Sequence, residues 1–237
     1  MQNASSTMQT GAQVQLRVNS FVRSVYNWMF IGLALTGLVA YYVSGSETLT
    51  RAIFGNPMLF FGLIIGELAM VFYLSARISK IQSTTATTLF LVYAALNGVT
   101  LSAIFLIYTQ ASIAATFFIC AATFAASSVY GWVTKRVLTS MGSFLFMGLI
   151  GIIIASVVNI FLRSSAMQMI FSYIGVVIFV GLTAYDTQKI KTMALSQPAD
   201  IDGTMVRKGA IMGALSLYLD FINLFLMLLR IFGSGRE

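Results

Sequence analysis

The chain has 237 residues, of which 58% are hydrophobic and only 9% are charged, and its mean hydropathy is +0.89. Soluble domains carry about 25% charged residues, so this composition excludes a water-soluble globule and indicates one compact membrane domain. The net charge of +7 is spread over the polar gaps, which is typical of membrane topology and excludes a nucleic-acid surface. The chain has no histidine and a single cysteine, so a histidine-dependent serine protease and an intrachain disulfide are excluded as well.

Seven apolar segments are each long enough to cross a bilayer as a helix, which requires about 20 residues. A polar tail at residues 1–20 precedes them and shows no signal-peptide pattern. The connections are short, except for an expected polar loop at Thr187–Gly209. We therefore expect an all-α integral membrane protein with a polar cytoplasmic tail, 1–20, and a single seven-helix transmembrane domain, 21–237. The segments are Val25–Val43, Met58–Ala76, Leu89–Tyr108, Ile113–Val133, Phe144–Leu162, Met169–Asp186 and Ala210–Leu229.

The basic residues gather on one side of these segments. Positive charge stays mainly on the cytoplasmic side of a membrane protein, so the N-terminus and the Thr187–Gly209 loop are predicted to be cytoplasmic. The C-terminus would be outside if the seventh segment crosses fully, and inside if that segment re-enters without crossing. The cytoplasmic set is Arg17, Arg23, Arg77, Lys80, Lys135, Arg136, Lys189, Lys191, Arg207 and Lys208, against Arg51, Arg163, Arg230 and Arg236 on the other side.

Three carboxyl groups lie within the apolar segments: Glu67, Asp186 and Asp220. A charged side chain inside a membrane helix costs about 2.5–3.5 kcal/mol on insertion scales, so each one that is retained needs a reason. Asp220 is the deepest, at roughly 18 Å from the last lysine before its helix if each residue rises 1.5 Å. It shares one small and polar helix face with Ser216 and Asn223, and such a face is expected to meet other helices or water.

Each carboxyl group also has a structural interpretation. A protonated Asp220 could form a hydrogen bond that holds its helix in place. Asp186 lies three residues before Lys189, where a simple interfacial ion pair would explain it. Glu67 fits a structural hydrogen bond as well as a functional role, and Arg77 fits an anchor that reaches to the membrane surface.

Two segments carry a resemblance to a known family. They are Gly181–Ile190, with the sequence GLTAYDTQKI, and Ser216–Phe225, with the sequence SLYLDFINLF. Together with the seven apolar segments they resemble the transmembrane Bax-inhibitor-motif family in its bacterial branch, over a region from about Arg17 to Arg230. The loop Thr192–Arg207 between the two motifs is longer than the family pattern.

The resemblance implies six helices around a central seventh and a pH-sensitive, calcium-permeable leak channel of the bacterial inner membrane. It implies that Asp186 and Asp220 form a proton-sharing pair that senses pH and lines the ion pathway, with Arg77 as its switching partner. It also implies a secondary polar contact between Glu67 and Arg230. Calcium would be the permeating ion and would bind transiently to the two aspartates, and no cofactor is expected.

Two carboxylates in one site of low dielectric constant cannot both ionise cheaply, so they would share a proton. The doubly ionised pair suits Ca²⁺, which prefers several oxygen ligands, whereas a singly protonated pair would hold a hydrogen bond and close the pore. One difficulty is that the two aspartates are expected at different depths in the membrane. Asp186 lies only about 5–8 Å from the lysines that mark the interface, against about 18 Å for Asp220, so helix spacing alone does not bring them together.

Two other functions compete with the channel. An intramembrane aspartyl protease would also use two aspartates, but Leu217–Asp220 has no flanking glycine and no Pro-Ala-Leu segment follows, so we do not expect an enzyme. The stronger alternative is a non-conducting regulator that binds a membrane protease or a quality-control complex through the tail and the Thr187–Gly209 loop. The expected partners are thus the lipid bilayer, Ca²⁺ and protons, with other membrane proteins in the regulator alternative and no nucleic acid.

Overall fold

The structure, a computed structural model, describes residues 2–198 and 200–236. Over these residues it is built from helices, with no strand beyond one isolated bridge between Tyr108 and Gly235. Seven of its helical segments are long and apolar enough to cross a membrane, which confirms the predicted fold class. In chain order the helices are α1 (Gln2–Ser44), α2 (Glu47–Phe54), α3 (Pro57–Arg77), α4 (Ser83–Leu101), α5 (Ala103–Ile107), α6 (Gln110–Val133), α7 (Thr139–Leu162), α8 (Ser165–Leu195) and α9 (Gly203–Phe232).

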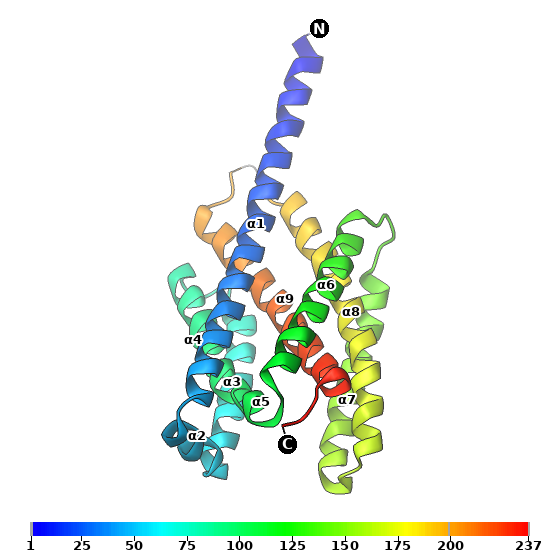
Figure 1. Ribbon diagram of the computed structural model, residues 1–237. Helices are drawn as coiled ribbons and strands as arrows, with labels where there is room; N and C mark the ends of the chain where they lie inside the picture. The colour runs from blue at the N-terminus through cyan, green and yellow to red at the C-terminus, as the bar shows by residue number, and fades with distance from the viewer. Residues whose placement is uncertain (1, 199, 237) are drawn as a thin grey trace.

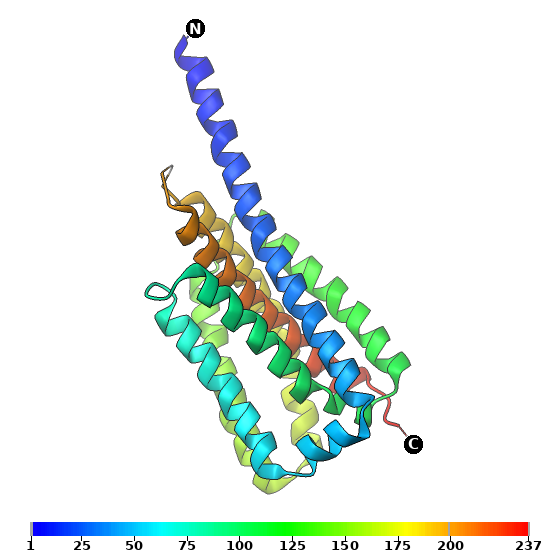
Figure 2. The same ribbon diagram turned by 90° about the vertical axis from the view of Figure 1, so that its left-hand side faces the viewer.

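The helices extend beyond the apolar segments at several ends, and the predicted Thr187–Gly209 loop is wrong. Helix α8 continues to Leu195 and α9 already begins at Gly203, which leaves a connection of residues 196–202. Hydropathy identifies only the part of a helix that lies in hydrocarbon, whereas polar residues continue the same helix into water. Helix α1 shows this most clearly, because its 43 residues span roughly 65 Å at 1.5 Å per residue, and it extends far beyond the bundle (Figure 2).

Helix α9 is the most buried of the seven spans. About two thirds (67%) of its most apolar window is buried, against at most 33% for any other span. It packs against α1, α4, α6 and α8, while α3 packs mainly on α4 and α7 on α8 (Figure 1). Four helices thus surround α9 directly, and the implied arrangement of six around one is not confirmed.

Aromatic and hydroxyl groups fix α9 within the bundle. Tyr218 is fully buried, and its ring meets Phe90 and Tyr93 of α4 edge-on, each with ring centroids 5.8 Å apart. Its hydroxyl lies 2.7 Å from Thr36 Oγ1 of α1, which in turn donates a hydrogen bond of 2.8 Å to the carbonyl of Ala94. The Tyr218 hydroxyl therefore enters the core with a partner, as a buried polar group requires.

The two ends of the described chain lie at opposite ends of the bundle (Figure 1). The N-terminal end of the bundle also holds the connection between α8 and α9, and the C-terminal end holds α2. Helix α9 has 30 residues, or roughly 45 Å, so it is long enough to cross the bilayer completely and does not turn back. Which end faces the cytoplasm stays a prediction.

Candidate functional site

Asp186 and Asp220 are both buried, with 7% and 5% of their surfaces exposed. They lie on α8 and α9, the two helices that pack most extensively on each other. The two carboxyl groups are close enough for their charges to act on one another. The structure thus brings together the two aspartates that the sequence singled out.

Contacts between α8 and α9 show how the two aspartates come close. The backbone of Gly213 packs against the side chain of Ile190, and the backbone of Gly175 packs against Met227. Both contacts give the same antiparallel register, in which Asp220 lies opposite Leu182–Thr183. Asp220 is therefore about one helical turn, or roughly 5 Å, deeper than Asp186. Most of the depth difference estimated from the sequence disappears, because α8 stays helical past its lysines.

A close approach of α6 and α7 completes the walls around Asp186. The backbone of Gly131 in α6 lies directly on the backbone of Ala184, and a side chain at Gly131 would overlap the Ala184 carbonyl. Gly142 of α7 lies under the ring of Tyr185, where a β-carbon would come within 2.6 Å of ring atoms. Small residues at these two positions allow both helices to reach the segment that carries Asp186.

Three buried polar atoms on α6, α8 and α9 have no hydrogen-bond partner among the described residues: Ser128 Oγ of α6, Thr187 Oγ1 of α8 and Asp220 Oδ2 of α9. These three helices all pack against one another. Buried polar groups are nearly always paired with protein, water or an ion, so these atoms offer positions for water or a cation. Sequence reasoning missed Ser128 and Thr187, although Thr187 directly follows Asp186 in the first motif.

The residues after Asp186 hold α8 to the end of α6 and to the connection between α6 and α7. Gln188 donates a hydrogen bond of 2.8 Å to the carbonyl of Arg136 and accepts one of 2.8 Å from the backbone N–H of Leu138. Lys191 donates to the carbonyl of Trp132 at 2.6 Å and lies 5.2 Å from the centroid of its indole ring. The first motif therefore combines the buried acid with groups that fix the adjacent connection.

The structure does not bring Arg77 to the aspartates. Arg77 is exposed at the end of α3, whose main contacts are with α2 and α4. In the described parts of the chain, the one side-chain ion pair joins Glu47 and Arg51 at the surface. Asp186 and Lys189 therefore form no ion pair either, and Lys189 instead lies 6.0 Å from the centroid of the Tyr185 ring.

The secondary polar residues are dispersed. Glu67 is half-buried and accepts a hydrogen bond from Thr100 of α4, whereas Arg230 is exposed on α9 and is not paired with it. Asn223 donates to the Leu219 carbonyl of its own helix at 2.8 Å, and Ser216 is half-buried. Within residues 2–198 and 200–236 no group of three or more carboxyl or thiol side chains could hold a metal ion, so the acidic part of the site is the aspartate pair.

Comparison with known proteins places the chain in one family. The family model for inhibitors of apoptosis-promoting Bax1 matches residues 18–237. Inner membrane protein YbhL of Escherichia coli is 51% identical over 224 residues, which cover 94% of this chain and 95% of that protein. An uncharacterized protein of Borreliella burgdorferi is 50% identical, over 92% of this chain and 94% of its own length, and one of Rickettsia prowazekii is 48% identical, over 92% and 90%. The match includes both motifs and every transmembrane span apart from the beginning of α1, and the chain is therefore a membrane protein of the Bax inhibitor family.

Proposed function

We propose that the protein is a pH-sensitive, calcium-permeable leak channel of the bacterial inner membrane, with the Asp186–Asp220 pair on its ion pathway. One observation carries the proposal: two buried carboxyl groups lie about one helical turn apart on adjacent membrane helices, and Asp220 Oδ2 has no partner among the described residues. Such a pair is costly inside a membrane, and intramembrane acids commonly mark ion or proton pathways. The name of the E. coli relative, an inner membrane protein, supports the location.

The chemistry of the pair suits an ion in transit. Ca²⁺ takes six to eight oxygen ligands, from carboxylates, other oxygens and water. When both aspartates are ionised they supply four carboxylate oxygens, and the unpartnered hydroxyls of Ser128 and Thr187 lie on the same three packed helices. A site with only two carboxyl groups holds Ca²⁺ weakly, and weak binding allows the ion to leave.

Protonation closes this site. Two like charges in a medium of low dielectric constant favour a shared proton, and the protonated pair loses half of its negative charge. The pair then attracts Ca²⁺ less, and a hydrogen bond between the carboxyl groups draws α8 and α9 together. Calcium flux therefore rises as the pH rises and both groups ionise. Arg77 can act as a switching partner only if the end of α3 moves toward α8 and α9, because it is exposed in this structure.

The non-conducting regulator is the second candidate, and the length of α1 favours it. The helix extends well beyond the bundle (Figure 2) and would give a partner protein a surface outside the membrane. Purified full-length protein in liposomes that contain a calcium indicator separates the two functions. The channel predicts calcium entry without any partner, faster at higher pH than at lower pH. Folded protein that admits no calcium at any pH would support the regulator and refute the channel.

A further inference from the structure

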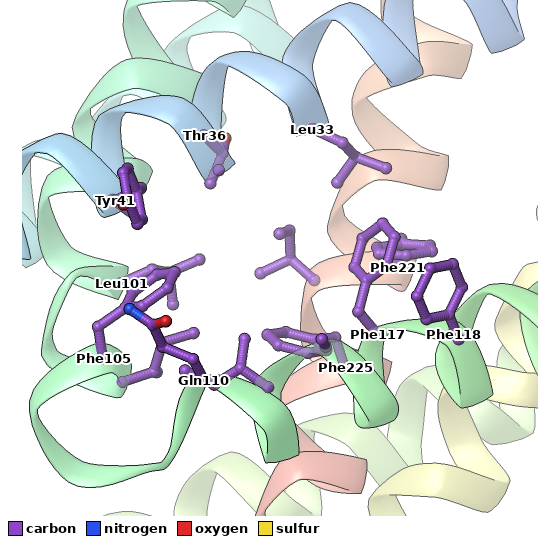
Figure 3. Close-up of a pocket in the computed structure, with 16 residues that line it drawn as sticks. Leu33, Thr36, Tyr41, Leu101, Phe105, Gln110, Phe117, Phe118, Phe221 and Phe225 are labelled. Carbon is purple, nitrogen blue, oxygen red and sulfur yellow. The ribbon is translucent and has the colours of Figure 1, made fainter.

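An apolar groove of about 480 Å³ lies between α1 and α6, and neither aspartate of the pair lines it (Figure 3). Leu33 and Tyr41 of α1 border one side, and Phe117 and Phe118 of α6 border the other, with Phe221 of α9 on the floor. Helices α1 and α6 make no extensive contact with each other, so the groove separates them. Its volume lies within the range of roughly 300–1,000 Å³ that is typical of small-molecule sites.

The groove opens to the lipid side of the bundle. Tyr41 and Phe118 on its borders are 63% and 71% exposed, which in a membrane means that they meet lipid. The space is also empty of protein on the α1 side, because a β-carbon at Gly37 would meet no atom within 4 Å. An acyl chain from the surrounding bilayer can therefore enter sideways, without any opening of the bundle.

The length of the groove selects one kind of occupant. Its borders run from Leu33 to Tyr41 on α1 and from Gln110 to Phe118 on α6, or roughly 12 Å along each helix. A transmembrane helix of a second protein needs a surface of about 30 Å. A length of 12 Å instead matches the depth of a single leaflet, so an acyl chain fits and a membrane-spanning helix does not.

A positive charge lies at the end of the groove. Arg236 donates a hydrogen bond from its guanidinium to the carbonyl of Phe105, a lining residue, at 2.8 Å. Its backbone N–H donates to the carbonyl of Ile107 at 2.9 Å, which holds the C-terminal segment against the end of α5. The guanidinium has five N–H donors, and among the described residues it has one hydrogen-bond acceptor, the Phe105 carbonyl, so other donors can bind a phosphate just beyond the end of α9.

We propose that this groove binds one anionic phospholipid, with an acyl chain against α1, α6 and α9 and its phosphate at Arg236. The inference does not depend on the proposed channel. It rests on an apolar space of one leaflet's depth, open to lipid and ending at a cation.

Native mass spectrometry of the full-length protein, loaded with equal parts of phosphatidylglycerol and phosphatidylethanolamine, tests the acyl-chain site. Ala114 and Ala115 are both exposed on α6, but only Ala114 lines the groove. Ala114→Trp should lose one retained lipid per chain and Ala115→Trp should retain it. Gly37→Leu fills the same space from α1 and should act like Ala114→Trp, which keeps the test valid if the tryptophan variant fails to fold. Equal lipid retention in the groove-filling variants and in Ala115→Trp would overturn the proposal.

The headgroup is tested by charge removal. Arg236→Gln keeps a hydrogen-bond donor for Phe105 but removes the charge, so the preference for phosphatidylglycerol should fall about fivefold. Arg163→Gln removes an exposed arginine that does not line the groove and should leave the preference unchanged. Equal retention of both lipids by the unaltered protein would refute the anionic headgroup. Disulfide-linked dimers of Ala114→Cys, in a Cys120→Ala background in native membranes, would assign the groove to a second copy and refute the lipid.

Discussion

The contact between α6 and α8 yields a sharp prediction for a single methyl group. In Gly131→Ala, the new β-carbon would lie 2.9 Å from both the Cα and the carbonyl carbon of Ala184, and closer still to its carbonyl oxygen. Carbon atoms in good contact lie about 3.5–4.0 Å apart, so the two helices must separate by up to roughly 1 Å. A backbone cannot rotate away as a side chain can. We therefore expect the upper end of the usual overpacking cost, about 3 kcal/mol.

Thermal unfolding of purified protein measures this cost. For a chain of this size roughly 2–4 °C is lost per kcal/mol, so Gly131→Ala should lower Tm by about 6–12 °C. Trp132 is the next residue and its fluorescence reports on the same contact. The matched control is Gly151→Ala on α7, where a β-carbon would meet nothing within 4 Å and the change should be neutral or stabilising. Equal Tm values for the two variants would refute the close helix contact that forms the wall of the site.

Three further predictions concern the ends and the centre of the bundle. Gln197→Cys in a Cys120→Ala background should react with a membrane-impermeant thiol reagent only from the cytoplasmic side, and reaction from outside would invert the topology. Gln188→Ala leaves two backbone groups of the α6–α7 connection without their partners, at a cost of about 1–3 kcal/mol. Amide hydrogen exchange in this connection should become faster, and an unchanged exchange rate would show that the two hydrogen bonds do not stabilise the connection. Asp220→Leu should fold and lose the pH response of any flux, while Asp220→Lys should fail to accumulate. A normal pH response in the leucine variant would show that Asp220 does not sense pH.

Hydropathy was enough to locate the seven spans, but it could not locate the ends of the helices. The residues from Thr187 to Leu195 are rich in polar side chains and still helical. Gln188 binds a backbone carbonyl of the neighbouring connection, and Lys191 binds one at the end of α6. The short helix α2 was missed for a related reason. It is stabilised by capping from Ser46 and by the Glu47–Arg51 pair, and neither feature leaves a hydropathy signal.

The aspartates of the site could be named from the sequence, but their relative position could not. Helix spacing is a property of one helix, whereas the depth of Asp220 relative to Asp186 depends on the register of two. That register is set by tertiary contacts such as Gly213 against Ile190. The same limit applies to Ser128, which becomes a candidate only when α6 is seen to pack on α8 and α9. It applies also to Arg77, whose exposure depends on where α3 lies.

The pH midpoint of calcium flux in liposomes tests the central claim most directly. Asp186→Asn and Asp220→Asn each keep the size of the side chain but remove one titrating group, so each should shift the midpoint or abolish the pH response. The double variant should shift the midpoint little beyond the shift of either single variant, because two groups that share one proton act as a unit. Asp200→Asn, an exposed acid outside the helices, should leave the midpoint unchanged. Independent and additive shifts from the two single variants would contradict a proton-sharing pair, even if the protein conducts calcium.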